Sequence, residues 1–502
     1  MSEDDVTRDT GDVQSSGALS RPREVLALVI AWTASEPERT GEIFAVPERG
    51  GPWVLGRGET SSDDEHPHVL ATLLRPGAPP RSRGLANPFL SRAQLTVRSE
   101  GGGVRLENVG KRALEHMGRE VTTALVREGE TVEVKGQLLL YCIRRSARPP
   151  ELRNIDSVRF PFGEPDEHGI VGESPKVWEL RDQLAFVARR RAHVLVLGPS
   201  GTGKELVARA IHGQSPRARR RMVSRNAATI PAGLASAELF GNVKNYPHAG
   251  MLERPGLVGE ADGSTLFLDE IGELPEELQA QLLRVLDEGG EYQRLGEARA
   301  RLADIRLIGA TNRDITELKH DLVARLRLRV HVPSLADRRE DIPLLLRHAL
   351  WRAAQGDPEI AERFFEEALV PRGAPSAVHD KRLYPRVDPA LVAALLRHPY
   401  ETHVRELEAL LWVSLSTSRR GIAELTPEVE QELARRTTQG SRTSAPPQAA
   451  PSPQAPPSAE EIEAVLARHG GSRELAWRDL GLSSRYALKR LMKKYGLQGG
   501  GE

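Results

Sequence analysis

A lysine at the end of a glycine-rich run and two adjacent carboxylates farther along the chain could together hydrolyse a nucleoside triphosphate. Residues 198–205 read GPSGTGKE and follow an apolar run over residues 192–197. Glycines let the backbone approach an anion closely, and the N–H groups that open the following helix would cradle a β-phosphate. The lysine would then reach the β- and γ-phosphates. The predicted nucleotide-binding residues of this run are Gly198, Ser200, Gly201, Thr202, Gly203, Lys204 and Glu205.

Two carboxylates end a second apolar run, which reads GSTLFLDE. Asp269 would hold Mg²⁺, directly or through water, and Glu270 would polarise the attacking water. A third run, IRLIGA, delivers Thr311 and Asn312 to the same strand-end face, where a polar side chain could sense the γ-phosphate. The ordered set of three segments predicts ATP hydrolysis with ATP and Mg²⁺ as ligands.

The order and the sequences of these segments resemble those of the AAA+ activators of sigma-54 RNA polymerase, also called bacterial enhancer-binding proteins. The resemblance covers residues 169–415 and includes ELFG, ADGSTLFLDEIGELP, LQAQLLRVL, ATNRD and RREDIPLL. It accounts for Glu205, because the family has Glu where other P-loops have Ser or Thr. It implies that Asn226 is the partner of Glu270 and restrains it until the nucleotide state changes. It also implies that Arg405, in the small helical lid, contacts the phosphates.

The resemblance further implies a ring, usually a hexamer, in which an arginine of one protomer stabilises the transition state in the next. The segment LKHDLVARL stands where the family carries two such residues. Arg325 keeps one of these positions and Lys319 occupies the other. A lysine supplies charge without the planar fork of a guanidinium. Hydrolysis is therefore expected either to be slower than in a typical relative or to depend on Arg325 alone.

The loop with which these activators grip sigma-54 differs in this chain. The family motif is GAFTGA, whereas residues 245–250 read NYPHAG. Pro247, at the place of the Phe, fixes φ and removes a hydrogen-bond donor. One alternative is that Tyr246 and His248 grip sigma-54 instead. A second is an ATP-responsive, DNA-binding regulator that does not remodel sigma-54, and a third is an AAA+ remodeller of a non-transcriptional target.

Short strand-like runs separated by Gly, Pro and charged turns fill residues 24–146 and predict an all-β sandwich. Within it, WVLGRG and FLSRAQLTV resemble a forkhead-associated (FHA) domain, the phosphothreonine-binding sandwich. The resemblance implies that Arg57 and Ser91 take the phosphate, with Arg92 beside them. Gln94 stands where the family has a structural His, and the family's later S-T-N-G-T motif is missing. The alternative is therefore a sandwich that docks a partner without reading phosphate.

The composition changes again after the ATPase. Residues 437–458 form a Pro/Ala/Ser/Gln tract, which predicts an extended tether. Residues 459–497 carry three groups of apolar side chains whose spacing predicts three short helices around one small core. This module resembles the Fis-type helix-turn-helix, which implies DNA binding. The residues predicted to contact DNA are Ser483, Ser484, Arg485, Tyr486, Lys489, Arg490 and Lys493.

The expected architecture is therefore multidomain. Residues 1–23 are predicted to be disordered and to carry no secretion signal, and the sandwich precedes an α/β P-loop ATPase over 169–345 with its helical lid over 346–436. The chain has 70 basic and 70 acidic side chains, so its charge does not favour general polyanion binding. A single cysteine excludes an internal disulfide and fits a reducing cytoplasm. The predicted partners are DNA, sigma-54 RNA polymerase, a phosphothreonine protein and further copies of the chain, with no membrane.

Overall fold

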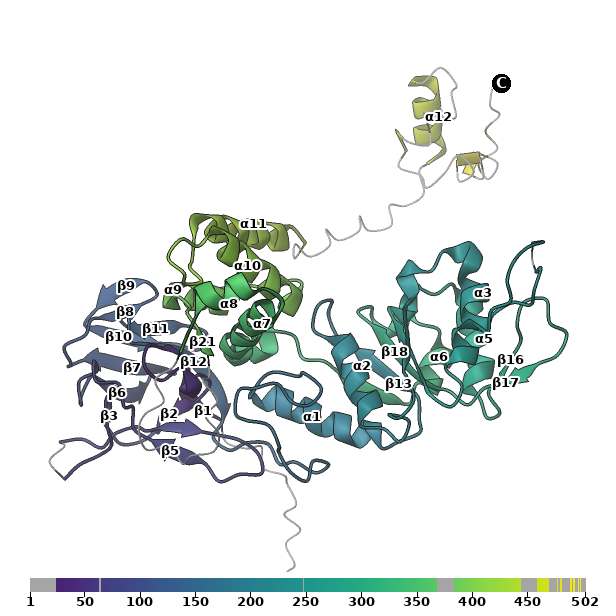
Figure 1. The fold of residues 1–502 in the computed structure, drawn as a ribbon. Coiled ribbons are helices and arrows are strands. Elements are labelled where there is room, and N and C mark those ends of the chain that lie inside the picture. Colours follow the sequence, from purple (N-terminus) through teal and green to yellow (C-terminus); the bar gives the residue numbers. More distant parts are fainter. Residues whose placement is uncertain are drawn as a thin grey trace, which may run out of the picture. The chain divides into compact units, whose positions relative to one another are not determined.

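Figure 1 shows the protein in a computed structural model. The chain divides into two compact units, Met1–Ala434 and Arg435–Glu502. The structure describes residues 24–62, 65–246, 248–367, 383–443 and 458–468, together with Ala476, Asp479, Leu480, Leu488, Lys489, Leu491, Met492, Tyr495 and Leu497. The predicted disordered segment, residues 1–23, lies outside the described residues.

The first unit begins with two antiparallel sheets, as expected for an all-β sandwich (Figure 1). The smaller sheet has the order β10 (Thr123–Val126), β7 (Gly103–Asn108), β6 (Leu95–Glu100), β3 (Trp53–Leu55). The larger sheet has the order β5 (Arg81–Arg83), β4 (Ala71–Leu73), β2 (Ile43–Ala45), β1 (Glu24–Thr33), β12 (Leu138–Ser146), β11 (Thr131–Val134), β8 (Leu114–His116), β9 (Arg119–Val121). The predicted β-rich region is confirmed.

Strand β1 is apolar on both faces, which is unusual for an antiparallel strand that has one face in solvent. Leu28 and Ile30 point into the core between the two sheets. Val29 and Ala31 point the other way and join a core formed with helices of the ATPase lid. Strand β12 is divided in the same manner, and its Cys142 is fully buried in the sandwich core. The continuous apolar runs of these two strands therefore reflect burial on both sides.

The ATPase domain is built on a parallel sheet with the order β14 (Val223–Asn226), β15 (Thr265–Asp269), β18 (Arg306–Thr311), β13 (Val194–Leu197), β19 (Leu328–His331). Helices α1 (Pro175–Ala188) and α2 (Lys204–Gly213) contribute to the core on one face of this sheet. The core on the other face draws on α3 (Ala235–Phe240), α4 (Gly256–Glu260), α5 (Glu276–Leu286) and α6 (His320–Arg325). Because all five strands are parallel, their carboxyl ends lie at one edge, where the predicted site residues follow them. Beyond α5, β16 (Glu291–Tyr292) and β17 (Arg301–Leu302) form a small hairpin.

The lid is helical, with one hairpin of β20 (Phe365–Glu367) and β21 (Leu383–Pro385). Its helices are α7 (Ile342–Gly356), α8 (Pro358–Phe364), α9 (Pro389–Arg397), α10 (His403–Thr417) and α11 (Pro427–Thr443). Helix α11 continues into residues 437–443, where a tether was predicted, so the predicted boundary is wrong by about two turns. These residues read TTQGSRT and contain no proline, which first appears at Pro446 and would interrupt a helix.

The sandwich packs directly on the lid. The outward faces of β1 and β12 share one apolar core with α7, α9 and α10. At the edge of this core, Arg145 of the sandwich donates to Glu340 over 2.8 Å, and both side chains are largely buried. Burial raises the pKa of Glu340 to about 7, because the loss of hydration outweighs the attraction of Arg145.

This raised pKa predicts a pH dependence of stability. A carboxyl group whose pKa is higher in the folded protein than in the unfolded chain stabilises the fold at low pH, and that contribution is lost as the pH rises through about 7. We expect the unfolding free energy of the wild type, measured relative to Glu340→Gln, to fall by up to about 3 kcal/mol between about pH 5 and pH 8. Urea melts followed by circular dichroism would measure it, with Glu359→Gln on the exposed lid surface as the control. A difference that stays constant with pH would contradict it.

The second unit contains α12 (Ala459–Arg468) and a small apolar core. The buried members of this core are Ile462, Val465, Ala476, Leu488 and Met492. All of these except Met492 are among the apolar side chains whose spacing predicted the small core. Of the residues predicted to contact DNA, Lys489 is described and exposed. The others, Ser483, Ser484, Arg485, Tyr486, Arg490 and Lys493, lie outside the described residues.

In the part of the chain that the structure describes, no helix is both long enough and apolar enough to cross a bilayer.

Candidate active site

The glycine-rich run forms the turn between β13 and α2, as its sequence predicts. Gly201 has φ +78° and Gly203 has φ +99°, a backbone conformation that side chains with a Cβ rarely adopt. A Cβ on Gly201 would lie 2.1 Å from the carbonyl oxygen of Thr402, so the lid approaches the loop too closely for any other residue. Helix α2 begins at Lys204, which directs the N–H groups of its first turn toward the loop.

Lys204 and Glu270 face each other across this loop. The Lys204 Nζ lies 3.6 Å from Glu270 Oε1 and donates to the carbonyl oxygen of Gly198 over 3.1 Å. Glu270 follows β15 in a left-handed conformation with φ +49°, which turns its side chain away from the line of the strand. Its Oε2 accepts a bond from the backbone N–H of Asn312 at 3.3 Å. The structure thus brings together residues from three separate strand ends.

Asn226 contacts Asp269 in this structure, where the sequence predicted Glu270. Its Nδ2 donates to Asp269 Oδ2 over 3.4 Å. The reason is the strand register, because Asn226 at the end of β14 is paired with Asp269 at the end of β15. Glu270, one residue later, turns toward Lys204. Burial raises the pKa of Asp269, and the adjacent Glu270 carboxylate raises it further.

Lys204, Asp269 and Glu270 line a cavity of about 640 Å³. The lid adds Arg405 to this lining, and its Nη1 donates to Ser200 Oγ over 3.3 Å. The apolar lining is Ile170, Val171, Leu180, Leu206, Val207, Val332, Leu345 and Leu407. A cavity with both polar and apolar lining fits a nucleoside triphosphate, with the phosphates on the loop and the nucleoside among apolar side chains.

The remaining predicted nucleotide-binding residues lie in or beside the same turn. Ser200, Thr202 and Glu205 also line the cavity, although Glu205 is paired with Arg209 on the exposed side of α2. Thr311 is fully buried at the end of β18, and its hydroxyl accepts a bond from the backbone of Arg313. The side chain of Thr311 is therefore engaged in shaping the strand end.

Several charged or polar cavity residues in and just before α7 were not predicted from the sequence. Arg338, His348 and Arg352 line the cavity, and Arg338 is buried and donates to the carbonyl oxygen of Val171 over 3.4 Å. Arg338 belongs to the RREDIPLL segment, which was noted for its resemblance and given no role. The RREDIPLL segment was therefore the sequence feature from which a cavity residue such as Arg338 could have been predicted.

Comparison with known proteins adds to this geometry. Residues 170–335 match the family model described as the sigma-54 interaction domain. The formate hydrogenlyase transcriptional activator FhlA of Escherichia coli is 44% identical over 212 residues, which are 41% of this chain and 29% of that protein. The transcriptional regulatory protein ZraR of Klebsiella oxytoca is 35% identical over 338 residues, which are 65% of this chain and 69% of that protein. The chain belongs to the sigma-54 activator family.

The central domain is accordingly an AAA+ ATPase domain, and the predicted enzyme class is confirmed. Among solved structures, NtrX from Brucella abortus in complex with ATP is 28% identical and covers 66% of this chain and 70% of its own, with a TM-score of 0.43. The chain spans less than a third of FhlA.

The two residues at the family's intersubunit positions are Arg325, at the end of α6, and Lys319, immediately before it. Arg325 forms an ion pair with Asp287, and Lys319 lies 3.5 Å from Glu276. Both cations are partly exposed. Neither residue is among those that line the cavity of their own chain.

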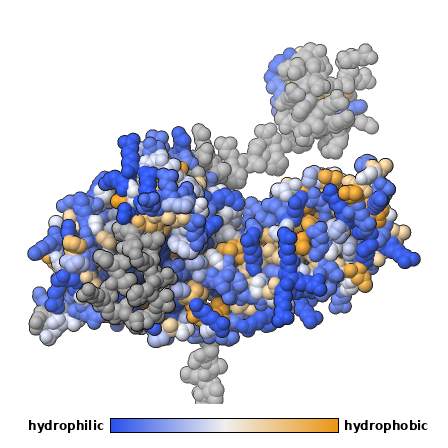
Figure 2. All heavy atoms as spheres, in the orientation of Figure 1, coloured by the Kyte–Doolittle hydropathy of each residue, from blue (hydrophilic) through white to orange (hydrophobic). Residues whose placement is uncertain are grey.

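Side chains of the loop at the family's sigma-54-contacting position hold its described residues in place. Asn245 has φ +67°, and its Oδ1 accepts a bond from Gly250 N over 3.0 Å. The ring of Tyr246 packs against Gly296, where an added Cβ would lie 2.6 Å from the ring. Pro247 lies outside the described residues, and His248 is exposed. On the face shown in Figure 2, hydrophobic patches interrupt the hydrophilic surface of the ATPase domain.

The predicted phosphopeptide residues of the sandwich also come together. The backbone N–H of Arg57 donates to the carbonyl oxygen of Ser91 over 3.0 Å, and Ser91 Oγ accepts a bond from Lys111 N over 3.1 Å. Arg57 and Arg92 are exposed at this end of the sandwich. Gln94 is fully buried, and its Nε2 donates to Asn108 Oδ1 over 2.8 Å, so it orders these loops from within.

Proposed function

We propose that the protein is an ATP-hydrolysing, DNA-binding transcription regulator that acts on sigma-54 RNA polymerase. ATP hydrolysis is supported above all by Lys204, Asp269 and Glu270, which line one nucleotide-sized cavity. Lys204 binds the β- and γ-phosphates, and Glu270 accepts a proton from the attacking water. Arg405 closes the phosphate end from the lid.

Mg²⁺ fits this donor set. Magnesium in nucleotide sites is usually held by one or two carboxylates together with phosphate oxygens. Asp269 supplies a carboxylate at the phosphate end, and Asn226 holds it in position through its side-chain amide. When bound, the ion would neutralise charge on the phosphates.

The rest of the proposal concerns partners. Residues 459–497 bind DNA upstream of the promoter, and copies of the chain form a ring, expected to be a hexamer, in which Arg325 reaches the next nucleotide. The sandwich is an FHA-type input domain in which Arg57, Ser91 and Arg92 take the phosphate of a phosphothreonine protein. This last role is supported by the convergence of these loops at one end of the sandwich.

The test is to trap the complex with sigma-54. We expect the intact protein to hydrolyse ATP and, with ADP and aluminium fluoride as a mimic of the transition state, to form a stable complex with sigma-54 on a gel-filtration column. The same preparation with ADP alone should form none. A complex would mean that NYPHAG replaces the family's GAFTGA loop.

A second function has a specific observation in its favour. Two residues of NYPHAG are engaged in contacts of their own, because Asn245 Oδ1 accepts a bond from Gly250 N and the Tyr246 ring packs against Gly296. Hydrolysis without a sigma-54 complex would favour an ATP-responsive, DNA-binding regulator that does not remodel sigma-54. If specific DNA binding were absent as well, a remodeller of a non-transcriptional target would be favoured.

A further inference from the structure

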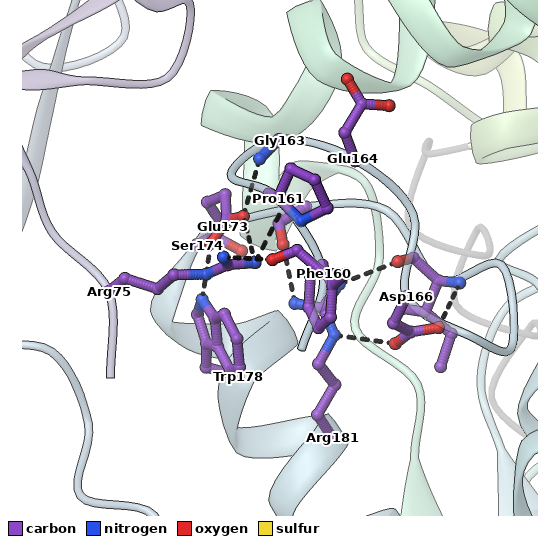
Figure 3. A network of polar contacts seen from close by, with 12 residues as sticks. Arg75, Phe160, Pro161, Gly163, Glu164, Asp166, Glu173, Ser174, Trp178 and Arg181 are labelled. Carbon is purple, nitrogen blue, oxygen red and sulfur yellow. Dashed lines mark hydrogen bonds and ion pairs between the residues drawn. The ribbon is translucent and has the colours of Figure 1, made fainter. Parts of the chain in front are cut away.

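One side chain of the sandwich crosses into the ATPase domain. Arg75 follows β4 and is 9% exposed. Figure 3 shows its guanidinium beside residues of the segment that joins the two domains and of α1. It donates to the carbonyl oxygen of Phe160 over 2.5 Å and to that of Pro161 over 3.3 Å. It also pairs with Glu173 at 3.2 Å.

The site that binds the Arg75 guanidinium consists of two stacked rings and a buried carboxylate. The rings of Phe160 and Trp178 are 5.8 Å apart at an interplanar angle of 14°. The Arg75 guanidinium carbon lies 4.4 Å from the centroid of Phe160 and 5.3 Å from that of Trp178, within the range of cation–π attraction. Glu173 also accepts bonds from Trp178 Nε1 and from Gly163 N. The planar guanidinium of arginine can donate to the carbonyls, pair with the carboxylate and stack on the rings at the same time, which the ammonium of a lysine cannot do.

A second arginine continues this network to the wall of the nucleotide cavity. Arg181 of α1 lies over the same two rings, at 4.7 Å from Phe160 and 4.6 Å from Trp178. Its Nη2 donates to the carbonyl oxygen of Ile170 and its Nη1 to that of Gly172, each over 2.8 Å. Ile170 and Val171 form part of the apolar lining of the cavity.

The other end of the same short segment is held by the lid. Asp341, just before α7, accepts bonds from the backbone N–H groups of Glu173 and Ser174 over 2.7 and 2.9 Å. The backbone that bears Ile170 is thus fixed at both ends, by the arginine network at one and by the lid at the other. Removal of Arg75 would leave the buried Glu173 without its nearest countercharge and free the segment that joins the two domains.

We propose that Arg75 of the N-terminal sandwich is a positioning residue for nucleotide binding, which acts through Phe160, Trp178 and Arg181 on the wall that receives the nucleoside. The proposal rests on the proposed ATP hydrolysis. It makes the docked sandwich a part of the nucleotide site, so that a partner which pulls the sandwich away would weaken ATP binding. Its effect is confined to the nucleoside end, because the network contacts none of the phosphate-binding residues.

The experiment uses the full-length chain with Arg75→Ala and Arg75→Lys, and with Arg98→Ala, an exposed arginine on β6 of the same sandwich, as the matched control. We expect KM for ATP, and Kd for a fluorescent ATP analogue, to rise about tenfold in Arg75→Ala, with kcat nearly unchanged. Arg75→Lys should recover only a small part of the affinity. Inorganic tripolyphosphate, which has no nucleoside, should compete equally well in all variants.

Several outcomes would overturn the proposal. KM and Kd equal to those of the wild type in either Arg75 variant would do so, as would an equal loss of tripolyphosphate affinity. A fall in kcat with KM unchanged would indicate a loss of folded protein instead. If Arg75→Ala does not fold, Arg75→Lys decides the question. Failure of the proposed function is separate, because it would appear as absent hydrolysis in the wild type and in Arg98→Ala.

Discussion

Replacement of Glu270 by Gln should lower the rate of ATP hydrolysis by about 10²- to 10⁴-fold, the usual contribution of a general base. Gln has the same shape but cannot accept the proton of the attacking water. Because Lys204 keeps its contacts with the loop, binding of ATP should remain close to that of the wild type. The measurement is steady-state phosphate release, with Kd for a fluorescent ATP analogue determined on the same samples.

Glu273→Gln is the matched control for this variant. Glu273 lies three residues farther along the same turn and is paired with Arg313, outside the cavity. It should hydrolyse ATP at nearly the rate of the wild type. Unchanged hydrolysis in Glu270→Gln would show that another group activates the water.

Arg325→Ala should lower the rate of ATP hydrolysis by a comparable factor, because Arg325 is expected to act on the site of the neighbouring subunit in the assembled ring. An arginine supplied by a neighbouring subunit contributes about 10³- to 10⁵-fold to the rate of related NTPases. Within the chain Arg325 is paired with Asp287, and both side chains are about half exposed. Ion pairs between exposed side chains contribute little to stability, so this pair can be exchanged readily for a phosphate on the next protomer. Lys319→Ala should change the rate only a few-fold if Arg325 carries the role alone.

Mixing the two inactive variants tests whether Arg325 acts between subunits. Glu270→Gln keeps a functional arginine, and Arg325→Ala keeps a functional site. In an equal mixture, an interface that pairs the intact site with the intact arginine should occur at about one position in four, and hydrolysis should recover to that extent. No recovery, despite demonstrated subunit exchange, would contradict action between subunits.

The fold was largely predictable where local sequence determines it. The glycine-rich turn and the carboxylates at the end of β15 were placed correctly, because parallel strands bring their carboxyl ends to one edge of the sheet. The contact between Asn226 and Asp269 was not predicted. It depends on the register between β14 and β15, which one sequence does not reveal. A shift of one residue decides whether a strand-end amide meets Asp269 or Glu270.

Contacts between domains were also not predicted from the sequence. The docking of the sandwich on the lid joins residues as far apart as Arg145 and Glu340, and that of Arg75 depends on a segment with no regular structure. The sequence carried one signal, the absence of alternation in β1 and β12, which indicates that a strand is buried on both faces. It did not reveal which surface covers the second face.

The burial of Cys142 has a practical consequence. It is the only cysteine of the chain, it is fully enclosed by the sandwich core, and burial raises the pKa of its thiol to about 12. The thiolate is the form that reacts with alkylating reagents, so the native protein should resist them while it is folded. A cysteine introduced on the surface would then take a fluorophore or spin label at that position alone, with the wild-type sequence as background. The movement of the sandwich against the lid could thus be followed in the otherwise unaltered protein.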